Sequence, residues 1–354
     1  MNDIIVIGGG IAGISAAARL SKHAQVTLLE AEEALGYHAS GRSAALFEEN
    51  YGNPTINALS RASAADQRPY LSPRGFLLLG RAGEDHAFDQ DLNALKTNEI
   101  SVDEARNHVP IINGKITRAA YHSGAQDIDT DRMIQDFARV IRVNGGQIHT
   151  KAQVEKLTFQ NNRWTVHSPQ GTHTAEIVVN AGGAWADHIA TLAGIPPIGL
   201  TPLRRSMART PAPAGHDITR WPIFFGVGEA WYAKPDAGKL LISPADETLV
   251  EPHDAYADDM ILAEGIDRFH QYVTHEVTRV ETTWAGLRTF ASDRTLVLGR
   301  DPINPSFIWC AGQGGYGFQT APAASQLIAD LILTQDTEFD EKTIADLSPD
   351  RFRK

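Results

Sequence analysis

The sequence contains a single cysteine, Cys310, among its 354 residues. A disulfide within the chain is therefore excluded, and so is a zinc site built on several cysteine thiolates. The thirteen histidines form no H-E-x-x-H motif and no other spacing typical of metal ligands. We therefore expect a protein without a bound metal.

Three alternating aspartates, Asp127, Asp129 and Asp131, are the one feature that looks like a calcium loop. The glycine and the glutamate that such a loop requires at later positions are absent from the sequence. We interpret Thr130 or Asp131 instead as the N-cap of a helix, because Thr and Asp side chains accept hydrogen bonds from the free N–H groups there.

Long apolar runs and clusters of basic residues are also lacking. No stretch reaches 18 apolar residues without a charge, so we expect no transmembrane segment. Met1–Ile7 is too short and too acidic for a secretory signal. The 32 Lys and Arg against 43 Asp and Glu give a net charge of −11, which argues against a nucleic-acid partner. We expect a cytoplasmic protein, and contact with a membrane surface stays open.

The clearest motif lies in residues 4–30. An apolar strand at 4–7, a G-x-G-x-x-G turn, a helix predicted at 14–20 and a second apolar strand at 26–29 follow one another there. Gly8 permits a tight turn, Gly10 lets the backbone approach a pyrophosphate, and Gly13 lets the helix pack close to the strand. Glu30 ends the second strand, where it can accept hydrogen bonds from ribose hydroxyls and disfavours a 2′-phosphate. These features predict a site for FAD or NAD rather than NADP.

Segments further along the chain favour FAD. Residues 36–46 are small and follow the second strand directly, so their backbone can lie along a large flat cofactor; a surface loop is the alternative. Residues 177–183 and 307–317 each run from an apolar strand into glycines, and a helix is expected at 320–333. Three glycine-rich turns, each at the end of a strand far from the others in the sequence, predict a single extended ligand that several segments contact.

These motifs resemble the D-amino-acid-oxidase-like family of FAD enzymes, which includes glycine oxidase, and within it the D-arginine dehydrogenase branch. The likeness runs nearly end to end. It rests on GYHASGRSAA at 36–45, DIDTD at 127–131, VNAGGAWAD at 179–187, PLRRS at 202–206, YAKPDAGKLLISPA at 232–245, TWAGLR at 283–288 and GQGGYGFQT at 312–320.

The resemblance implies an α/β (α+β) fold with two domains. One would be a Rossmann-type FAD-binding domain, and the other a discontinuous substrate domain built on a mixed or antiparallel sheet. We predict the FAD-binding domain in 1–47, 128–200 and 284–354, and the substrate domain in 48–127 and 201–283. The length of the chain is sufficient for two domains.

Cofactor binding is expected from the glycine-rich segments and the strand ends. The absence of cysteine from the N-terminal flavin segments favours non-covalent FAD. The predicted cofactor-binding residues are Gly8, Gly10, Ile11, Ala12, Gly13, Glu30, Ala31, Gly41, Arg42, Ser43, Ala44, Val154, Ala181, Gly182, Trp185, Gly286, Arg288, Gly312, Gly314, Gly315, Tyr316, Gly317, Gln319 and Thr320.

An amino-acid substrate presents a carboxylate, which a planar guanidinium binds through two parallel hydrogen bonds. Arg288 is our candidate for this role, and a structural salt bridge is the alternative. The resemblance also assigns Arg205, Tyr232, Tyr51 and the backbone of Gly315 to the catalytic site. The tyrosine hydroxyls can donate hydrogen bonds to a carboxylate or bind an amine.

The implied reaction is the oxidative deamination of a D-amino acid. A hydride passes from Cα to flavin N5, and water hydrolyses the imino acid to a 2-keto acid and ammonia. Bound water and Tyr51 are both candidates for the group that takes the amine proton. Oxygen, a quinone or another carrier can serve as the electron acceptor. The alternatives are glycine, an N-methyl amino acid or a 2-hydroxy acid as substrate, and a non-enzymatic flavin-binding redox sensor.

The substrate side chain is expected to be apolar or aromatic. In the D-arginine dehydrogenase branch, a glutamate at the position of Phe76 meets the substrate guanidinium. An aromatic ring cannot pair a buried guanidinium, and burying that charge without a partner is costly. Leu46 adds a second apolar group. Two alternatives stay open: Phe76 belongs to the core of its strand, or Glu48 or Glu49, just before Tyr51, supplies a replacement carboxylate.

Overall fold

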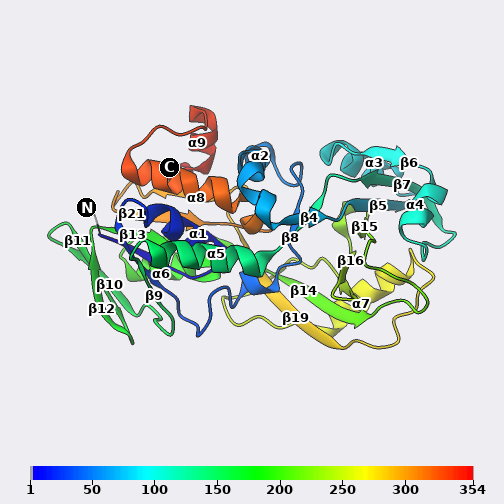
Figure 1. Cartoon of the computed structure of the whole chain (residues 1–354), viewed down its shortest axis with the longest axis horizontal. Coiled ribbons are helices and arrows are strands. Elements are labelled where there is room, and N and C mark those ends of the chain that lie inside the picture. Colours follow the sequence, from blue (N-terminus) through cyan, green and yellow to red (C-terminus); the bar gives the residue numbers. More distant parts are fainter. Residues whose placement is uncertain (1–2, 354) are drawn as a thin grey trace.

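The computed structural model describes residues 3–353 (Figure 1). Met1, Asn2 and Lys354 belong to the predicted FAD-binding ranges but lie outside the described residues. The helices are α1 (Ile11–Leu20), α2 (Pro54–Gln67), α3 (Asp85–Ala94), α4 (Val102–His108), α5 (Thr130–Val143), α6 (Ala186–Leu192), α7 (Asp259–His270), α8 (Gly317–Leu333) and α9 (Glu341–Leu347). The strands are β1 (Asp3–Ile7), β2 (Gln25–Leu29), β3 (Leu46–Phe47), β4 (Leu71–Pro73), β5 (Phe76–Arg81), β6 (Asn98–Ile100), β7 (Ile116–His122), β8 (Gln126–Ile128), β9 (Gln147–His149), β10 (Lys156–Gln160), β11 (Arg163–Ser168), β12 (Gly171–Ala175), β13 (Ile177–Asn180), β14 (Thr201–Pro211), β15 (Ile223–Gly226), β16 (Tyr232–Asp236), β17 (Lys239–Ser243), β18 (Thr248–Leu249), β19 (Thr282–Phe290), β20 (Val297–Arg300) and β21 (Phe307–Ala311).

A six-stranded sheet carries the predicted dinucleotide motif. Its strand order is β20-β21-β13-β1-β2-β9, and every pair except β20–β21 is parallel. Ile4 and Val6 pack into one core with α1, α5 and α8, whereas Ile5 and Ile7 pack into another with α6 and β11. The apolar run of β1 is continuous because successive side chains enter two different buried layers. The sequence prediction of a strand buried on both faces is confirmed.

The turn between β1 and α1 depends on two glycines. Gly8 has a φ of 108°, which lies in the region that favours glycine. A Cβ added to Gly13 would lie 1.9 Å from the carbonyl oxygen of Gly8, so only glycine lets the helix pack this close to the strand. The helix begins at Ile11 rather than at residue 14, because Gly10 is its N-cap.

A nine-stranded sheet forms the other end of the molecule (Figure 1). Its order is β18-β14-β17-β16-β15-β5-β7-β6, and β19 pairs with β14. The β5–β15 pair is parallel and the others are antiparallel, so the sheet is mixed. A core that includes Leu77, Phe224, Trp231 and Phe269 packs on it. The predicted fold, a Rossmann-type sheet combined with a mixed sheet, is confirmed.

The division into an FAD-binding domain (1–47, 128–200 and 284–354) and a substrate domain (48–127 and 201–283) stays a proposal. β19, which begins at Thr282, pairs along its whole length with β14, and its last residue, Phe290, belongs to the same core as Ile4 and Val6 of the first sheet. A smaller third sheet has the strand order β3-β8-β4.

The prediction for the start of α5 was wrong by one residue. Its N-cap is Asp129, whose side chain accepts a hydrogen bond of 3.1 Å from the backbone N–H of Arg132. Asp127 is engaged elsewhere, in ion pairs with Arg74 and Lys234. Two of the three alternating aspartates therefore have structural partners. Within residues 3–353, no group of three His, Cys, Asp or Glu side chains is arranged to hold a metal.

Candidate active site

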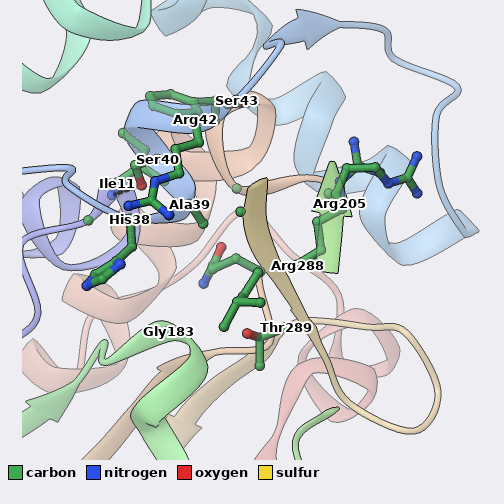
Figure 2. A pocket seen from close by; sticks show the side chains of 18 of the residues that line it. Ile11, His38, Ala39, Ser40, Arg42, Ser43, Gly183, Arg205, Arg288 and Thr289 are labelled. Carbon is green, nitrogen blue, oxygen red and sulfur yellow. Dashed lines mark hydrogen bonds between the residues drawn. The ribbon is translucent and has the colours of Figure 1, made fainter. Parts of the chain in front are cut away.

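A cavity of about 800 Å³ is lined by residues from both large sheets. Figure 2 shows part of this lining. This volume is within the range of cofactor and substrate sites. The predicted catalytic and specificity residues all line it: Tyr51, Arg205, Tyr232, Arg288, Gly315, Leu46, Glu48 and Phe76.

Most of the predicted cofactor-binding residues line the same cavity. These are Gly8, Gly10, Ile11, Ala12, Glu30, Ala31, Arg42, Ser43, Ala44, Val154, Ala181, Gly182, Trp185, Gly286, Arg288, Gly314, Gly315, Gly317 and Gln319. Five predicted residues, all of them within the described part of the chain, lie outside the lining: Gly13, Gly41, Gly312, Tyr316 and Thr320. Gly13 serves the packing of α1 instead, and Tyr316 packs edge-on against Tyr51.

The N-terminus of α1 opens into the cavity beside the glycine turn. Gly8, Gly10 and Ile11 line the space, and the first turn of the helix carries no acidic side chain. The Ile11 N–H donates to the Ser40 hydroxyl over 3.0 Å, whereas Gly10 presents backbone without a side chain. A helix N-terminus of this kind favours phosphate through its N–H groups and its dipole. The residues present therefore fit the diphosphate of a dinucleotide.

Glu30 has a structural function in addition to the predicted one. Its carboxylate accepts hydrogen bonds from the backbone N–H of Gly9 at 2.5 Å and of Glu32 at 2.8 Å. It is buried and lines the cavity at the end of β2. One carboxylate thus ties the glycine turn to the second strand and still borders the space in which we expect the ribose.

The segment after β2 is fixed across the cavity by Arg42. Its guanidinium donates to the carbonyl oxygens of Ala255 at 2.8 Å and Ala285 at 2.9 Å, and it also pairs with Asp254. The indole N–H of Trp284 donates back to the Arg42 carbonyl oxygen over 3.2 Å. Figure 2 shows this segment facing the strand that carries Arg288. The arginine predicted to touch the cofactor therefore also holds the loop in position.

Four polar side chains meet at the other end of the cavity. The Tyr51 hydroxyl donates to Glu229 over 3.0 Å, and Arg205 donates to the same carboxylate over 3.1 Å. Arg288 donates to the Tyr51 hydroxyl over 3.4 Å and lies 3.9 Å from Glu229. Figure 2 shows Arg205 and Arg288 on the neighbouring strands β14 and β19. The predicted residues Tyr51, Arg205 and Arg288 are thus brought together.

The pKa values in this cluster keep its donors protonated. Burial disfavours the charge of Arg288, but the neighbouring Tyr51, Tyr232 and Glu229 outweigh that effect and raise the pKa of Arg288 above its usual value. Burial, and then the negative charge of Glu229, raise the pKa of Tyr51. Tyr51 therefore remains a neutral hydrogen-bond donor and Arg288 remains a cation at physiological pH.

The glycine-rich turn before α8 lies directly against Arg288. A Cβ added to Gly315 would come within 3.1 Å of the Arg288 guanidinium. A side chain at position 315 would therefore displace the arginine, so glycine there preserves its position. Arg204, the neighbour of Arg205, pairs with Asp246 instead, which supports the choice of Arg205 for the site.

The sequence reasoning missed the carboxylates of the cluster. Glu229 binds Tyr51 and Arg205, and Glu247 binds Arg205 at 3.3 Å and Arg294 at 2.7 Å. With Glu247 and Arg294 added to it, the cluster has three guanidinium groups and two carboxylates, and therefore one net positive charge. That balance suits a ligand with one carboxylate. Neither glutamate lies in a recognisable motif, so no local signal marked them.

Beyond this cluster, the wall of the cavity is mainly apolar. Phe76 and Phe225 lie with ring centroids 5.6 Å apart, and both line the space with Leu46, Met207 and Ile223. Glu48 is the buried acidic residue in this wall. Phe76 is itself 1% exposed, so it belongs both to the strand core and to the cavity wall.

No helix within residues 3–353 is long and apolar enough to cross a membrane.

The buried Cys310 lies outside the cavity lining. The described part of the chain thus offers no cysteine at the site for a bond to a cofactor.

Comparison with known proteins identifies the family. The sequence model of the FAD dependent oxidoreductase family matches residues 3–331. Glycine oxidase of Geobacillus kaustophilus is 22% identical over 369 residues, which cover 96% of this chain and 94% of the relative. Its crystal structure superposes with a TM-score of 0.83 at 20% identity and covers 98% of both chains. The crystal structure of L-proline dehydrogenase from P. horikoshii gives a TM-score of 0.84 at 23% identity and covers 99% of this chain and 98% of that one. The chain therefore belongs to the DAO family of FAD-dependent oxidoreductases.

Proposed function

We propose that this enzyme oxidises a D-amino acid with an apolar or aromatic side chain to its imino acid, which water hydrolyses to a 2-keto acid and ammonia. The observation that carries the proposal is the meeting of Arg288, Arg205 and Tyr51 in a cavity bordered by the glycine turn Gly8–Gly10. A site that binds one carboxylate beside a dinucleotide-binding motif suits an amino acid.

Substrate orientation comes from the chain's own residues. Arg288 would hold the substrate carboxylate through its planar guanidinium, and Tyr51 would donate a further hydrogen bond. The cluster's net positive charge attracts the carboxylate, and Glu229 offers an acceptor to the substrate amine. When bound, FAD supplies the electron sink for the hydride that leaves Cα. Arg288 and Tyr51 are both partly buried, and the reduced contact with water strengthens these interactions.

The apolar wall supports a side chain larger than that of glycine. Leu46, Phe76, Met207, Ile223 and Phe225 all line the cavity. Burying a matching substrate group against them contributes ~1–3 kcal/mol per group. D stereochemistry rests on the likeness of the flavin-loop and strand motifs to D-amino-acid dehydrogenases.

The test is a panel of D- and L-amino acids, glycine, sarcosine and 2-hydroxy acids, mixed without oxygen with the FAD-loaded enzyme. Loss of the yellow flavin absorbance reports oxidation, and assays for keto acid and ammonia identify the products. We expect apolar and aromatic D-amino acids to reduce the flavin. Reduction by 2-hydroxy acids alone would reject the amino-acid assignment.

A further inference from the structure

Glu48 is a buried carboxylate with one unused oxygen. It directly follows β3, its side chain is 4% exposed, and it lines the cavity. Its Oε1 accepts hydrogen bonds from the backbone N–H of Asn50 at 3.0 Å and from the Asn50 side-chain amide at 3.3 Å. Its Oε2 has no hydrogen-bond partner among residues 3–353. A buried acceptor without a partner is destabilising, so a ligand that supplied a donor would bind more tightly for it.

The segment around Glu48 is held in place. The Glu48 N–H donates to the Gln319 side-chain oxygen over 3.4 Å, and the Gln319 amide donates to the Tyr51 carbonyl oxygen over 3.1 Å. Glu48 and Tyr51 are therefore anchored to the same residue of α8. The unused oxygen of Glu48 consequently has a fixed position relative to the carboxylate-binding cluster that contains Tyr51.

The groups around Glu48 favour a neutral aromatic partner. Phe76 and Leu46 line the cavity with it. Burial also raises the pKa of the Glu48 carboxyl, which weakens its preference for a cation. Nε2 of His122 lies 3.4 Å from the free oxygen, and the His122 ring packs 5.3 Å from that of Phe76. The free oxygen thus lies beside two neighbouring rings, which suits a flat aromatic side chain that ends in a neutral O–H or N–H group.

Building on the proposed function, we propose that Glu48 accepts a hydrogen bond from a donor at the tip of an aromatic substrate side chain. The substrate class is then D-amino acids whose ring carries an O–H or N–H, such as D-tyrosine and D-tryptophan. In this binding mode Phe76 and Leu46 contact the apolar part of the substrate side chain, and the free oxygen of Glu48 accepts a hydrogen bond from its polar end. Such a buried acceptor rejects an analogue that lacks the donor, because the acceptor is then left unpaired.

The test compares kcat/KM for D-tyrosine and D-phenylalanine, which differ only in the hydroxyl. The wild-type enzyme should prefer D-tyrosine by at least tenfold. In Glu48→Gln, the side-chain oxygen should stay with the Asn50 N–H and an NH₂ group should replace the free oxygen, so the ratio should fall to about one or below. Glu49→Gln is the matched control, because Glu49 is exposed and outside the cavity lining, and it should keep the wild-type ratio. A wild-type ratio near one, or an unchanged ratio in Glu48→Gln, would overturn the assignment.

Failure of the proposed function gives a different result. If neither D-amino acid reduces the flavin, the proposed oxidation is wrong, and the role of Glu48 is then measured by binding. The probes are 3-(4-hydroxyphenyl)propionate and 3-phenylpropionate, whose affinities follow from the absorbance change of bound FAD. We expect the hydroxylated acid to bind at least tenfold more tightly to the wild type and this preference to vanish in Glu48→Gln. Equal affinities in the wild type would reject the role of Glu48.

Discussion

The Tyr51 hydroxyl donates a 3.0 Å hydrogen bond to the carboxylate of Glu229, so a carboxylate of the chain itself is bound where we propose that the substrate carboxylate binds. Arg205 donates to the same group over 3.1 Å. An incoming carboxylate must therefore share or take over donors that Glu229 already uses. An amino acid differs from a simple acid here, because its amine can interact favourably with Glu229.

Neutralising Glu229 should strengthen the binding of a carboxylate that has no amine. We expect Glu229→Gln to bind 3-phenylpropionate about tenfold more tightly, because the like-charge repulsion inside the site is removed. The dissociation constant follows from the absorbance change of bound FAD. Glu264→Gln on the exposed face of α7 is the control and should bind like the wild type. Weaker or unchanged binding in Glu229→Gln would show that Glu229 does not compete with the ligand.

Removing the Arg288 guanidinium should abolish most of the activity while the cofactor stays bound. Arg288→Ala should lower kcat/KM by an amount that corresponds to a loss of ~2–5 kcal/mol in transition-state stabilisation, which is the cost of truncating one partner of a desolvated charge pair. Arg288→Lys should recover only part of this, since it lacks the bidentate fork. Arg279→Ala, at an exposed arginine, is the matched control. Kinetics of Arg288→Ala near those of the wild type would contradict the carboxylate-anchor role.

FAD should be held without a covalent bond and should depend on Gly10. We expect one FAD per chain, released into the supernatant when the protein is denatured. Gly10→Val should lose most of the FAD, because its side chain would enter the space beside the α1 N-terminus. Gly114→Val serves as control, since a Cβ there meets nothing within 4 Å. Flavin that stays with the precipitated chain would argue for a covalent bond.

The single thiol should be unreactive in the folded enzyme. Burial raises the pKa of Cys310 to about 12, so the thiolate that reacts with thiol reagents is scarce at pH 8. A chromogenic disulfide reagent should detect no thiol in the native holoenzyme and one per chain in denaturant. Rapid modification of the native protein, with retention of its absorbance and activity, would show that Cys310 is accessible.

The first sheet could be predicted because the residues that specify its first strands and the turn between them lie close together in the sequence. In residues 3–30, apolar side chains fill two buried layers, and Gly8 and Gly13 are required by a φ of 108° and by a close backbone approach. The start of α1 was expected too late because glycine rather than a polar side chain caps it. Such details depend on backbone geometry that a hydrophobic pattern does not reveal.

The electrostatics of the site could not be foreseen from the sequence. Tyr51 and Glu229 are 178 residues apart, and Arg288 and Tyr51 are 237 apart. Arg288, Arg205 and Tyr51 were found through long motifs shared with the family. Glu229 lies outside these motifs, and only the folded chain brings it to them.

The most direct test of the proposed oxidation is the anaerobic reduction of the bound FAD by single enantiomers, followed at the flavin absorbance. The proposal predicts that D-phenylalanine, D-leucine and D-methionine reduce the flavin, that their L enantiomers do not, and that D-arginine and D-lysine are at least tenfold poorer in kcat/KM. If the cationic substrates are tenfold better, the apolar-pocket assignment is wrong. If the L enantiomers reduce the flavin faster than the D enantiomers, the central claim of D-amino-acid oxidation is contradicted.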